Sequence, residues 1–321
     1  MSTWPALEPL TKIALVVLNW NGLDDTRACL ESLRSVDSEV QVIVVDNGST
    51  DRSCEVIAEL HPEVELLRTG ANLGFSAGNN VGLRKALADG ATHIGLLNND
   101  TVVMPGFLGP LMRCLTAQPA AVASPDIRYY SDPHQSWFAG GVLDSGTGRP
   151  RHLLQEELPA RGGKPLSTDL ITGCCALATR ETWEEVGLLD EDFFIIFEDA
   201  DWSMRARALG HPLMVVPDSV IRHKVSRSFR QADVAALGRY YFARNGMEFV
   251  RRHGSPSGRR RTFLTQSLVR PTLREVKVSP RVGLRALLFV SLGVGAHYVR
   301  STGPAPAWVV RLSVWRSTRH G

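Results

Sequence analysis

Short apolar runs alternate with helix-like segments through the first hundred residues, and no other feature constrains the fold as strongly. The apolar runs are rich in β-branched residues, as in KIALVVLNW (12–20). Strand, helix, strand at this spacing is typical of right-handed βαβ units, which build a parallel sheet. The apolar runs are 12–20, 40–47, 64–68 and 92–98, and the helical segments between them are 24–35, 50–61 and 76–90. We therefore predict an α/β fold with a mostly parallel sheet flanked by helices.

Composition limits the class of protein. A chain of 321 residues with 44% hydrophobic residues can form one large domain with an appendage. Its five cysteines lack C-x-x-C spacing, which disfavours structural zinc and favours reduced thiols in the cytoplasm. The N-terminal sequence has no basic segment followed by an apolar one, so we expect no signal peptide.

Charge divides the chain into two parts. Residues 251–321 hold 14 Lys and Arg and one acid, whereas residues 1–250 hold 22 Lys and Arg and 32 Asp and Glu. An acidic body disfavours nucleic acid as a partner. We predict a ligand-binding domain over 1–225, followed by a helical, basic C-terminal region over 226–321.

Polar residues follow three of the predicted strands, at 19–21, 46–51 and 98–100. Open parallel sheets bind ligands beyond the carboxyl ends of their strands, so these clusters predict one shared site. Asp46 can accept hydrogen bonds from a nucleoside, although a capped turn explains the same residues. The glycines of NLGFSAGNN (72–80) suit close approach to a phosphate, or a tight turn.

Two further groups of residues suit catalysis on a charged substrate. Asp100 is a hard oxygen ligand for Mg²⁺ or Mn²⁺, and the imidazole of His223 could complete the metal shell. In FEDADW (197–202), one of the clustered acids suits a general base, and Trp202 suits a flat wall for a sugar ring. The simpler alternatives are a turn cap at Asp100, a structural histidine, and acids that favour a helix start.

In this order, the motifs resemble family-2 inverting glycosyltransferases of the GT-A fold, especially bacterial rhamnosyltransferase-like members. The resemblance covers about residues 12–250, and it departs from the family where Asn98 replaces the first acid of the Asp-x-Asp motif. The matching stretches are VVLNWNG (16–22), VVDNGSTD (44–51), NLGFSAGNNVGL (72–83), LLNND (96–100), TGCCALATRE (172–181), FFIIFEDADWSMRARALG (193–210) and HKVSRS (223–228).

The resemblance implies a role for each matching residue. Asp199 would be the catalytic base, and Glu198 an acid that orients the acceptor. Asp100 and His223 would bind the divalent metal. Nucleotide binding would fall to Asn19, Asn21, Asp46, Asn72, Gly74, Gly78, Asn79 and Asn98, and the acceptor side to Gly173 and Trp202.

The implied activity is inverting sugar transfer in cell-wall or polysaccharide biosynthesis. The donor would be a dTDP- or UDP-linked sugar, with dTDP-rhamnose as the first choice, and the acceptor a glycan or a polyprenyl-linked sugar. Two alternatives are a non-catalytic sugar-nucleotide-binding scaffold and a nucleotidyltransferase. The second is disfavoured because NWNGLDD (19–25) lacks the expected Gly-rich loop with Lys or Arg. Assembly as a homo-oligomer is left open.

The basic tail has its own pattern. The apolar run 286–299 is too short and too closely flanked by arginines to span a bilayer. Trp308, Leu312 and Trp315 share one helical face beside arginines, which is typical of helices on anionic membrane surfaces. We expect peripheral binding to the inner face of the plasma membrane, with docking of these helices on the acidic body as the alternative.

Overall fold

The computed structural model describes residues 11–36, 39–158, 163–225, 232–254 and 259–314. Within them, one sheet of ten strands runs in the order β10-β12-β6-β11-β4-β1-β2-β3, with β5 on β12 and β7 on β6. The strands are β1 (Ile13–Asn19), β2 (Val40–Asp46), β3 (Glu65–Arg68), β4 (His93–Asn98), β5 (Thr101–Val103), β6 (Val122–Tyr129), β7 (Ser136–Phe138), β10 (Leu166–Ser167), β11 (Cys175–Thr179) and β12 (Leu213–His223), and β8 (Gly141–Leu143) and β9 (Pro150–His152) form a separate hairpin.

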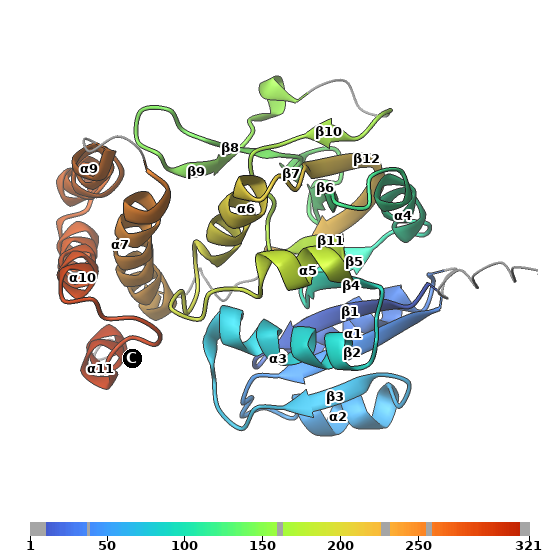
Figure 1. Cartoon of the computed structure of the whole chain (residues 1–321). Helices are drawn as coiled ribbons and strands as arrows, with labels where there is room; N and C mark the ends of the chain where they lie inside the picture. The colour runs from blue at the N-terminus through green and yellow to red at the C-terminus, as the bar shows by residue number, and fades with distance from the viewer. Residues whose placement is uncertain (1–10, 37–38, 159–162, 226–231, 255–258, 315–321) are drawn as a thin grey trace, which may run out of the picture.

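Helices cover both faces of the sheet (Figure 1). Before the end of β12 they are α1 (Leu23–Leu33), α2 (Ser53–Leu60), α3 (Gly74–Ala88), α4 (Leu108–Ala117), the 3-10 turn η1 (Gln155–Glu157), α5 (Arg180–Val186) and α6 (Glu198–Ala208). After it come α7 (Ala232–His253), α8 (Arg259–Thr262), the π-helical segment η3 (Phe263–Val269), α9 (Arg270–Val278), α10 (Pro280–Tyr298) and α11 (Ala307–Val314). The basic tail is helical, as predicted.

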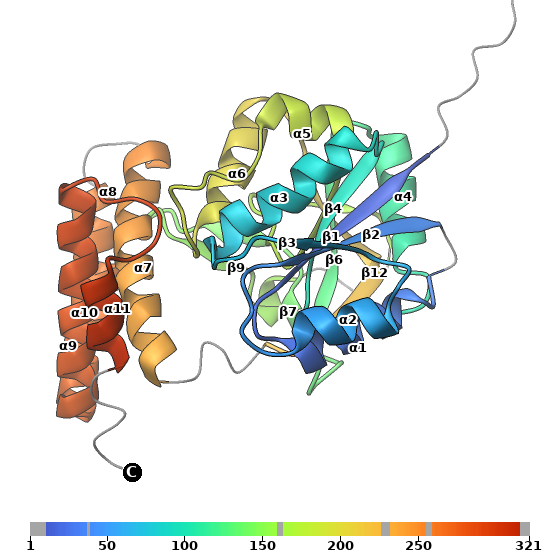
Figure 2. The ribbon, with the colours of Figure 1, turned by 90° about the horizontal axis from the view of Figure 1, so that it is seen from below.

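Alternate side chains of β1 belong to two different hydrophobic cores, one on each face of the sheet. Leu15 and Val17 pack with α1, α2 and α4 on one face. Ala14 and Val16 pack with α3, α5 and α6 on the other. Successive side chains of a strand point to opposite faces, so an unbroken apolar run is needed where both faces are covered. Figure 2 shows α1 and α2 on the side of the sheet opposite α3.

The sheet is mixed, and its mostly parallel part is the part that the sequence predicts. β1 pairs in parallel with β2 and β4, and β2 with β3. β11 then pairs antiparallel with β4, with Cys175 opposite Leu97. The amide of Asn98 continues this ladder by donating to the carbonyl of Cys174 at 2.8 Å. The segment before β11 therefore lies beside the polar tip of β4.

The C-terminal helices pack through α7 on the part of the chain that carries the sheet. Phe249 and Val250 of α7 share a core with Phe193 and Phe197 from the segment that precedes α6. α10 lies against α7 at close range, because Gly293 faces the carbonyl of Tyr240. No described helix combines the length and apolarity that crossing a bilayer requires. All five cysteines are free.

We predict that Gly293→Ala destabilises the protein, whereas Gly295→Ala on the same helix does not. A Cβ at position 293 would stand 2.3 Å from the Tyr240 oxygen, and nothing lies within 4 Å of one at position 295. Overpacking of this kind costs about 1–3 kcal/mol, and an unhindered Gly-to-Ala change in a helix gains about 0.5–1 kcal/mol. Urea unfolding of both variants measures the difference. Equal unfolding free energies would contradict the close packing of α10 on α7.

Candidate active site

The first polar cluster is a buried hydrogen-bonded network at the ends of β1 and β2. The Asn19 amide donates to Asp46 Oδ1 at 2.9 Å and to Ser49 Oγ at 3.1 Å. Burial raises the pKa of Asp46, but hydrogen bonds from Ser49, Cys54 and Asn19 outweigh it and hold the pKa below its ordinary value. Asp46 thus stays charged while nearly covered.

Asn19 and Asn21 both organise the loops around this network. Asn19 is fully buried, and its Oδ1 accepts from the Thr26 hydroxyl at 2.8 Å. Asn21 has a positive φ of 50°, and its Oδ1 accepts from the Thr50 amide at 2.7 Å. The Asn21 side-chain oxygen and the Asn19 amide nitrogen therefore join the loops after β1 and β2, and Asn19 bears on the site by holding Asp46.

The segment 72–80 contributes mostly through its backbone. Asn72 Oδ1 caps the Gly74 amide at 2.9 Å, and Gly74 takes a positive φ of 85° at the start of α3. The structure corrects two of the predicted nucleotide contacts. Asn79 is 2% exposed and donates to the carbonyl of Phe75, so its amide is turned into the helix. A Cβ on Gly78 would meet Leu18 at 2.7 Å, so this glycine lets α3 pack on β1.

Asp100 and His223 meet beyond the tip of β4. His223 stands opposite Thr101 in the β5–β12 pairing, and its Nε2 lies 3.0 Å from Asp100 Oδ1. Both side chains are buried, and His223 Nδ1 has no hydrogen-bond partner among the described residues. Asn98 ends β4 next to them, with its side chain partly exposed. Two potential metal ligands that are far apart in sequence thus face one another.

As metal ligands, Asp100 and His223 would make only a sparse site. In the described part of the chain, no three His, Cys, Asp or Glu side chains gather as ligands. Mg²⁺ and Mn²⁺ nevertheless suit one or two protein ligands when substrate phosphates and water supply the rest. His223 Nδ1 has no hydrogen-bond partner within the described structure, so a tautomer protonated at Nδ1 would leave Nε2, which faces Asp100, able to bind a cation. The donor set therefore fits a metal that a diphosphate shares.

The acids of FEDADW separate at the start of α6. Asp199 Oδ2 accepts from the Gly173 amide at 3.1 Å, which joins α6 to the segment before β11. Glu198 is buried, and one of its carboxyl oxygens has no hydrogen-bond partner within the described structure. Burial, with the nearby charge of Asp199, raises the pKa of Glu198 well above its ordinary value. The Asp199 carboxylate thus receives a hydrogen bond, whereas the neighbouring Glu198 is buried with one oxygen unpaired within the described structure.

A strained turn sets the direction of this helix start. Ile196 and Phe197, directly before Glu198, have positive φ angles of 71° and 79°. Such angles are rare for bulky residues and rarer for β-branched ones. The Asn245 amide of α7 donates to the carbonyl of Ile195 at 2.8 Å and to that of Ile196 at 3.0 Å. The C-terminal region therefore holds the turn that presents Asp199.

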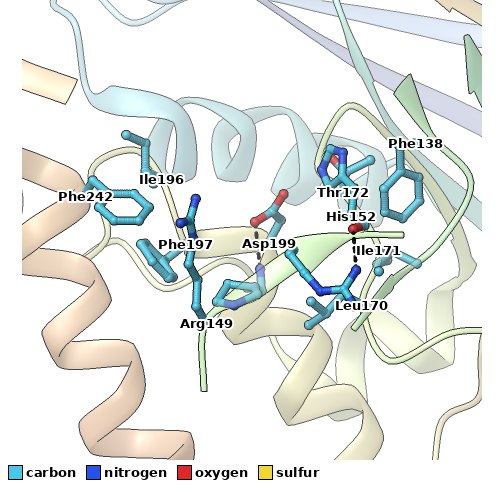
Figure 3. Close-up of a pocket in the computed structure, with 14 residues that line it drawn as sticks. Phe138, Arg149, His152, Leu170, Ile171, Thr172, Ile196, Phe197, Asp199 and Phe242 are labelled. Atoms are coloured by element: carbon cyan, nitrogen blue, oxygen red, sulfur yellow. Dashed lines mark hydrogen bonds between the residues drawn. The ribbon is translucent and has the colours of Figure 1, made fainter. Parts of the chain in front are cut away.

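A cavity of about 180 Å³ opens beside Asp199. It lies among the β8–β9 hairpin, the start of α6 and α7, and Figure 3 shows the side chains around it. Arg149 stacks over Phe242 of α7, with its guanidinium carbon 5.1 Å from the ring centroid. The residues that line the cavity are Phe138, Gly141, Arg149, Pro150, Arg151, His152, Leu170, Ile171, Thr172, Ile196, Phe197, Asp199, Ala200 and Phe242.

His152 is a site residue that the sequence analysis missed. Its Nδ1–H donates to the Trp137 carbonyl at 2.8 Å, and its ring packs edge-on against Trp137 with centroids 4.7 Å apart. Burial lowers the pKa of His152, while the Asp199 charge acts in the opposite direction. Trp137 also contacts His223 edge-on at 4.4 Å. His152 and Trp137 therefore link the cavity to the Asp100–His223 pair.

The structure corrects the prediction for Trp202. This side chain is 2% exposed, and its indole N–H donates to the carbonyl of Gly187 at 2.7 Å. Its ring packs on Trp183 with centroids 4.6 Å apart, within the core under α5 and α6. No face of Trp202 is open to a sugar ring. Gly173, by contrast, lies next to Asp199 and donates its amide to that carboxylate.

Asp100 and Asp199 lie near one junction of the sheet, because the Asn98 amide donates to the Cys174 carbonyl and the amide of the preceding Gly173 donates to Asp199. The charges of both aspartates act on the buried thiol of Cys174, where with burial they raise its pKa well above its ordinary value. The charges of Asp199 and His223 both act on His152, where the first raises its pKa and the second lowers it. Residues 14–186, more than half of the chain, match the model of the family described as Glycosyl transferase family 2. The chain belongs to glycosyl transferase family 2.

Individual relatives of this glycosyltransferase agree with that assignment. The dTDP-rhamnosyl transferase RfbF of Shigella flexneri is 23% identical over 253 residues, covering 77% of this chain and 82% of that protein. The N-acetylglucosaminyl-diphospho-decaprenol L-rhamnosyltransferase of Mycobacterium tuberculosis is 27% identical over 216 residues, covering 60% and 69%. Sugar transfer in polysaccharide biosynthesis is thus the activity class of this chain.

Solved structures confirm the predicted fold. The Pyrobaculum calidifontis mannosyltransferase PcManGT, determined with GDP-Man and Mn²⁺, has a TM-score of 0.54 at 15% identity. The match covers 94% of this chain and 90% of that one, so it extends over the C-terminal helices as well as the sheet. The GT-A architecture predicted from the motifs is therefore present.

Proposed function

We propose that the chain transfers rhamnose from dTDP-rhamnose to a hydroxyl of a glycan or lipid-linked sugar, with inversion at the anomeric carbon. The observation that carries this proposal is the position of Asp199 in the wall of a cavity adjoining the Asp100–His223 pair. Two relatives named as rhamnosyltransferases support the donor, and one of them is named for a diphospho-decaprenol acceptor.

The proposed reaction uses Asp199 as general base. Its carboxylate removes the proton of the acceptor hydroxyl, whose oxygen forms a bond to the anomeric carbon. The bond from that carbon to the diphosphate oxygen breaks on the opposite face, and the nucleoside diphosphate leaves. The Gly173 amide donates to Asp199 Oδ2 at 3.1 Å and the Ala200 amide to Oδ1 at 2.7 Å, so two backbone amides orient the carboxylate. Glu198, neutral through its burial, adds no competing charge.

A divalent cation completes the proposal, held by Asp100 and His223 and by the donor diphosphate. Bound there, it would neutralise the charge that develops on the leaving diphosphate. The fold neighbour determined with GDP-Man and Mn²⁺ supports a divalent ion, and Mg²⁺ and Mn²⁺ both suit the ligands. Asn98 in place of an acid leaves Asp100 as the carboxylate ligand from this motif.

Two activities of other classes remain as outcomes of the same assay. A non-catalytic scaffold would bind nucleotide sugars without releasing nucleoside diphosphate. A nucleotidyltransferase would release pyrophosphate from a nucleoside triphosphate and a sugar phosphate. A panel of nucleotide sugars scored for nucleoside diphosphate, with a parallel panel of nucleoside triphosphates and sugar phosphates scored for pyrophosphate, separates these from sugar transfer and identifies the donor.

We predict that Asp199→Asn lowers kcat for dTDP release from dTDP-rhamnose by about 10²–10⁴-fold, the usual contribution of a general base. The affinity for dTDP should stay within about twofold, because this residue lies on the cavity side rather than in the Asn19–Asp46 network. Asp218→Asn, an equal charge change at an exposed position, is the matched control. Near-normal turnover in Asp199→Asn would remove Asp199 as the base.

We also predict that chelation with EDTA abolishes turnover and that Mn²⁺ or Mg²⁺ restores it. Asp100→Asn should raise the metal concentration for half-maximal activity by about tenfold or more, because one of two protein ligands loses its charge. The exposed His134→Ala serves as a control for His223→Ala. Full activity in EDTA would show that Asp100 and His223 act without a metal.

A further inference from the structure

The outermost layer of the C-terminal region presents an apolar face. α10 buries Phe289 and Gly293 against α7, whereas Leu284, Leu288 and Tyr298 on its other side are 58%, 44% and 66% exposed. The intervals of four and fourteen residues place Leu288 and Tyr298 about 40° to either side of Leu284, within an arc of about 80° around the helix. In both views of the molecule, α9 and α10 lie on the far side of α7 from the sheet (Figures 1 and 2).

Neighbouring elements extend this surface. Val278 and Val282, around the turn from α9 to α10, are 87% and 54% exposed. Val299 and Trp308 are 77% and 53% exposed. We call the exposed apolar side chains of α9, α10 and α11 the outer face. Large exposed apolar side chains gathered on neighbouring elements are typical of an interaction site.

The charge around the outer face is almost entirely positive. Residues 259–314 contain ten Lys and Arg and one acid, Glu275, which pairs with Arg239 of α7. The exposed cations beside the apolar side chains include Arg274, Lys277 and Arg281. Two copies of the outer face pressed together by a two-fold axis would bring these cations toward one another. An anionic surface would instead neutralise them.

We propose that the outer face binds the surface of a bilayer that contains anionic lipids. Exposed Leu, Val and Trp side chains would enter the interface, and Arg and Lys would contact the headgroups. This extends the expectation from the tail sequence to defined residues. Leu312 is partly buried against α7, so it does not join Trp308 on the surface, and Trp315 lies outside the described residues.

Vesicle flotation of the full chain tests the proposal. With vesicles of phosphatidylcholine and phosphatidylglycerol the protein should float, and with pure phosphatidylcholine or in high salt it should float much less. Leu284→Glu/Leu288→Glu should lower the partition coefficient at least about tenfold, since acidic side chains oppose both apolar and charge contacts. The control is Leu60→Glu/Leu209→Glu, the same change at exposed leucines outside the C-terminal region.

Three outcomes would overturn the proposal. If wild-type protein stays at the bottom of the gradient in the presence of anionic vesicles, the outer face does not bind membranes. Equal loss of flotation in the control means that net charge alone governs binding. A dimer in solution that only Leu284→Glu/Leu288→Glu dissociates, without vesicle binding by the wild type, makes the outer face a contact between copies. None of these readouts requires the proposed donor or catalytic base.

A separate observation concerns the strained turn before Asp199. Asn245 is 2% exposed, and both of its donated bonds go to carbonyls of this turn. Its Oδ1 accepts from Arg244 Nε at 2.9 Å, and the Arg244 guanidinium stacks over the Tyr241 ring, 5.1 Å from its centroid. Two consecutive bulky residues at positive φ persist only where their surroundings hold them.

We infer that Asn245 is a positioning residue for Asp199, an inference that rests on the proposed function for what Asp199 does. Without its amide, the turn at Ile196 and Phe197 can relax to negative φ. α6 begins at the next residue, so relaxation would move the Asp199 carboxylate relative to the cavity. The C-terminal region would then set the geometry of a catalytic group that it does not itself carry.

A double-mutant cycle of Asn245→Ala with Ile196→Gly tests this inference. Asn245→Ala should speed amide hydrogen exchange at 195–200 and lower kcat for dTDP release about tenfold, with KM for dTDP-rhamnose little changed. Both effects should be smaller when position 196 is glycine, because glycine adopts positive φ without strain. Equal effects in both backgrounds, or unchanged exchange at 195–200, would overturn it. The exchange readout is independent of the donor, so it stands whether or not Asp199 is the base.

Discussion

The antiparallel pairing of β11 with β4 is the constraint on which the site depends. β4 runs parallel to β1 on one side and antiparallel to β11 on the other, so its polar tip becomes the junction of two sheet halves. The bond from the Asn98 amide to the Cys174 carbonyl fixes Gly173 beside that tip. Gly173 in turn holds Asp199. A hundred residues of intervening chain are bridged by one strand pairing and one backbone hydrogen bond.

The acids around this junction are stabilised in different ways, and the difference follows from their partners. Asp46 is covered but receives several hydrogen bonds, which keep its pKa low. Glu198 is covered with few partners, which raises its pKa. Burial alone therefore does not decide the charge of a carboxyl group; the number of donors that reach it does. The Asp46 carboxyl group therefore keeps its charge, whereas the Glu198 carboxyl group, next to Asp199, favours its neutral form.

Sequence reasoning succeeded where a pattern is repeated or a motif is compact. The parallel strands β1 to β4, the place of Asp46 and the approach of His223 to Asp100 all followed from runs and motifs. It failed for Trp202 and Asn79, because a helix start exposes some of its side chains and buries others, and FEDADW and NLGFSAGNN have no period that tells which. His152 was missed because 131–168 has no periodicity, and its place at the cavity depends on the β8–β9 pairing and on contacts with Trp137 and Phe138.

The C-terminal helices are better understood as part of the active site than as an appendage. A boundary near residue 225 separates the sheet from these helices in sequence, but α7 supplies Phe242 to the cavity and Asn245 to the turn before Asp199. The same helix carries α10 on its other side, packed through Gly293. α7 therefore connects the outer face to the cavity. If the outer face binds a bilayer as proposed, the bilayer would also fix the orientation of the cavity beside Asp199.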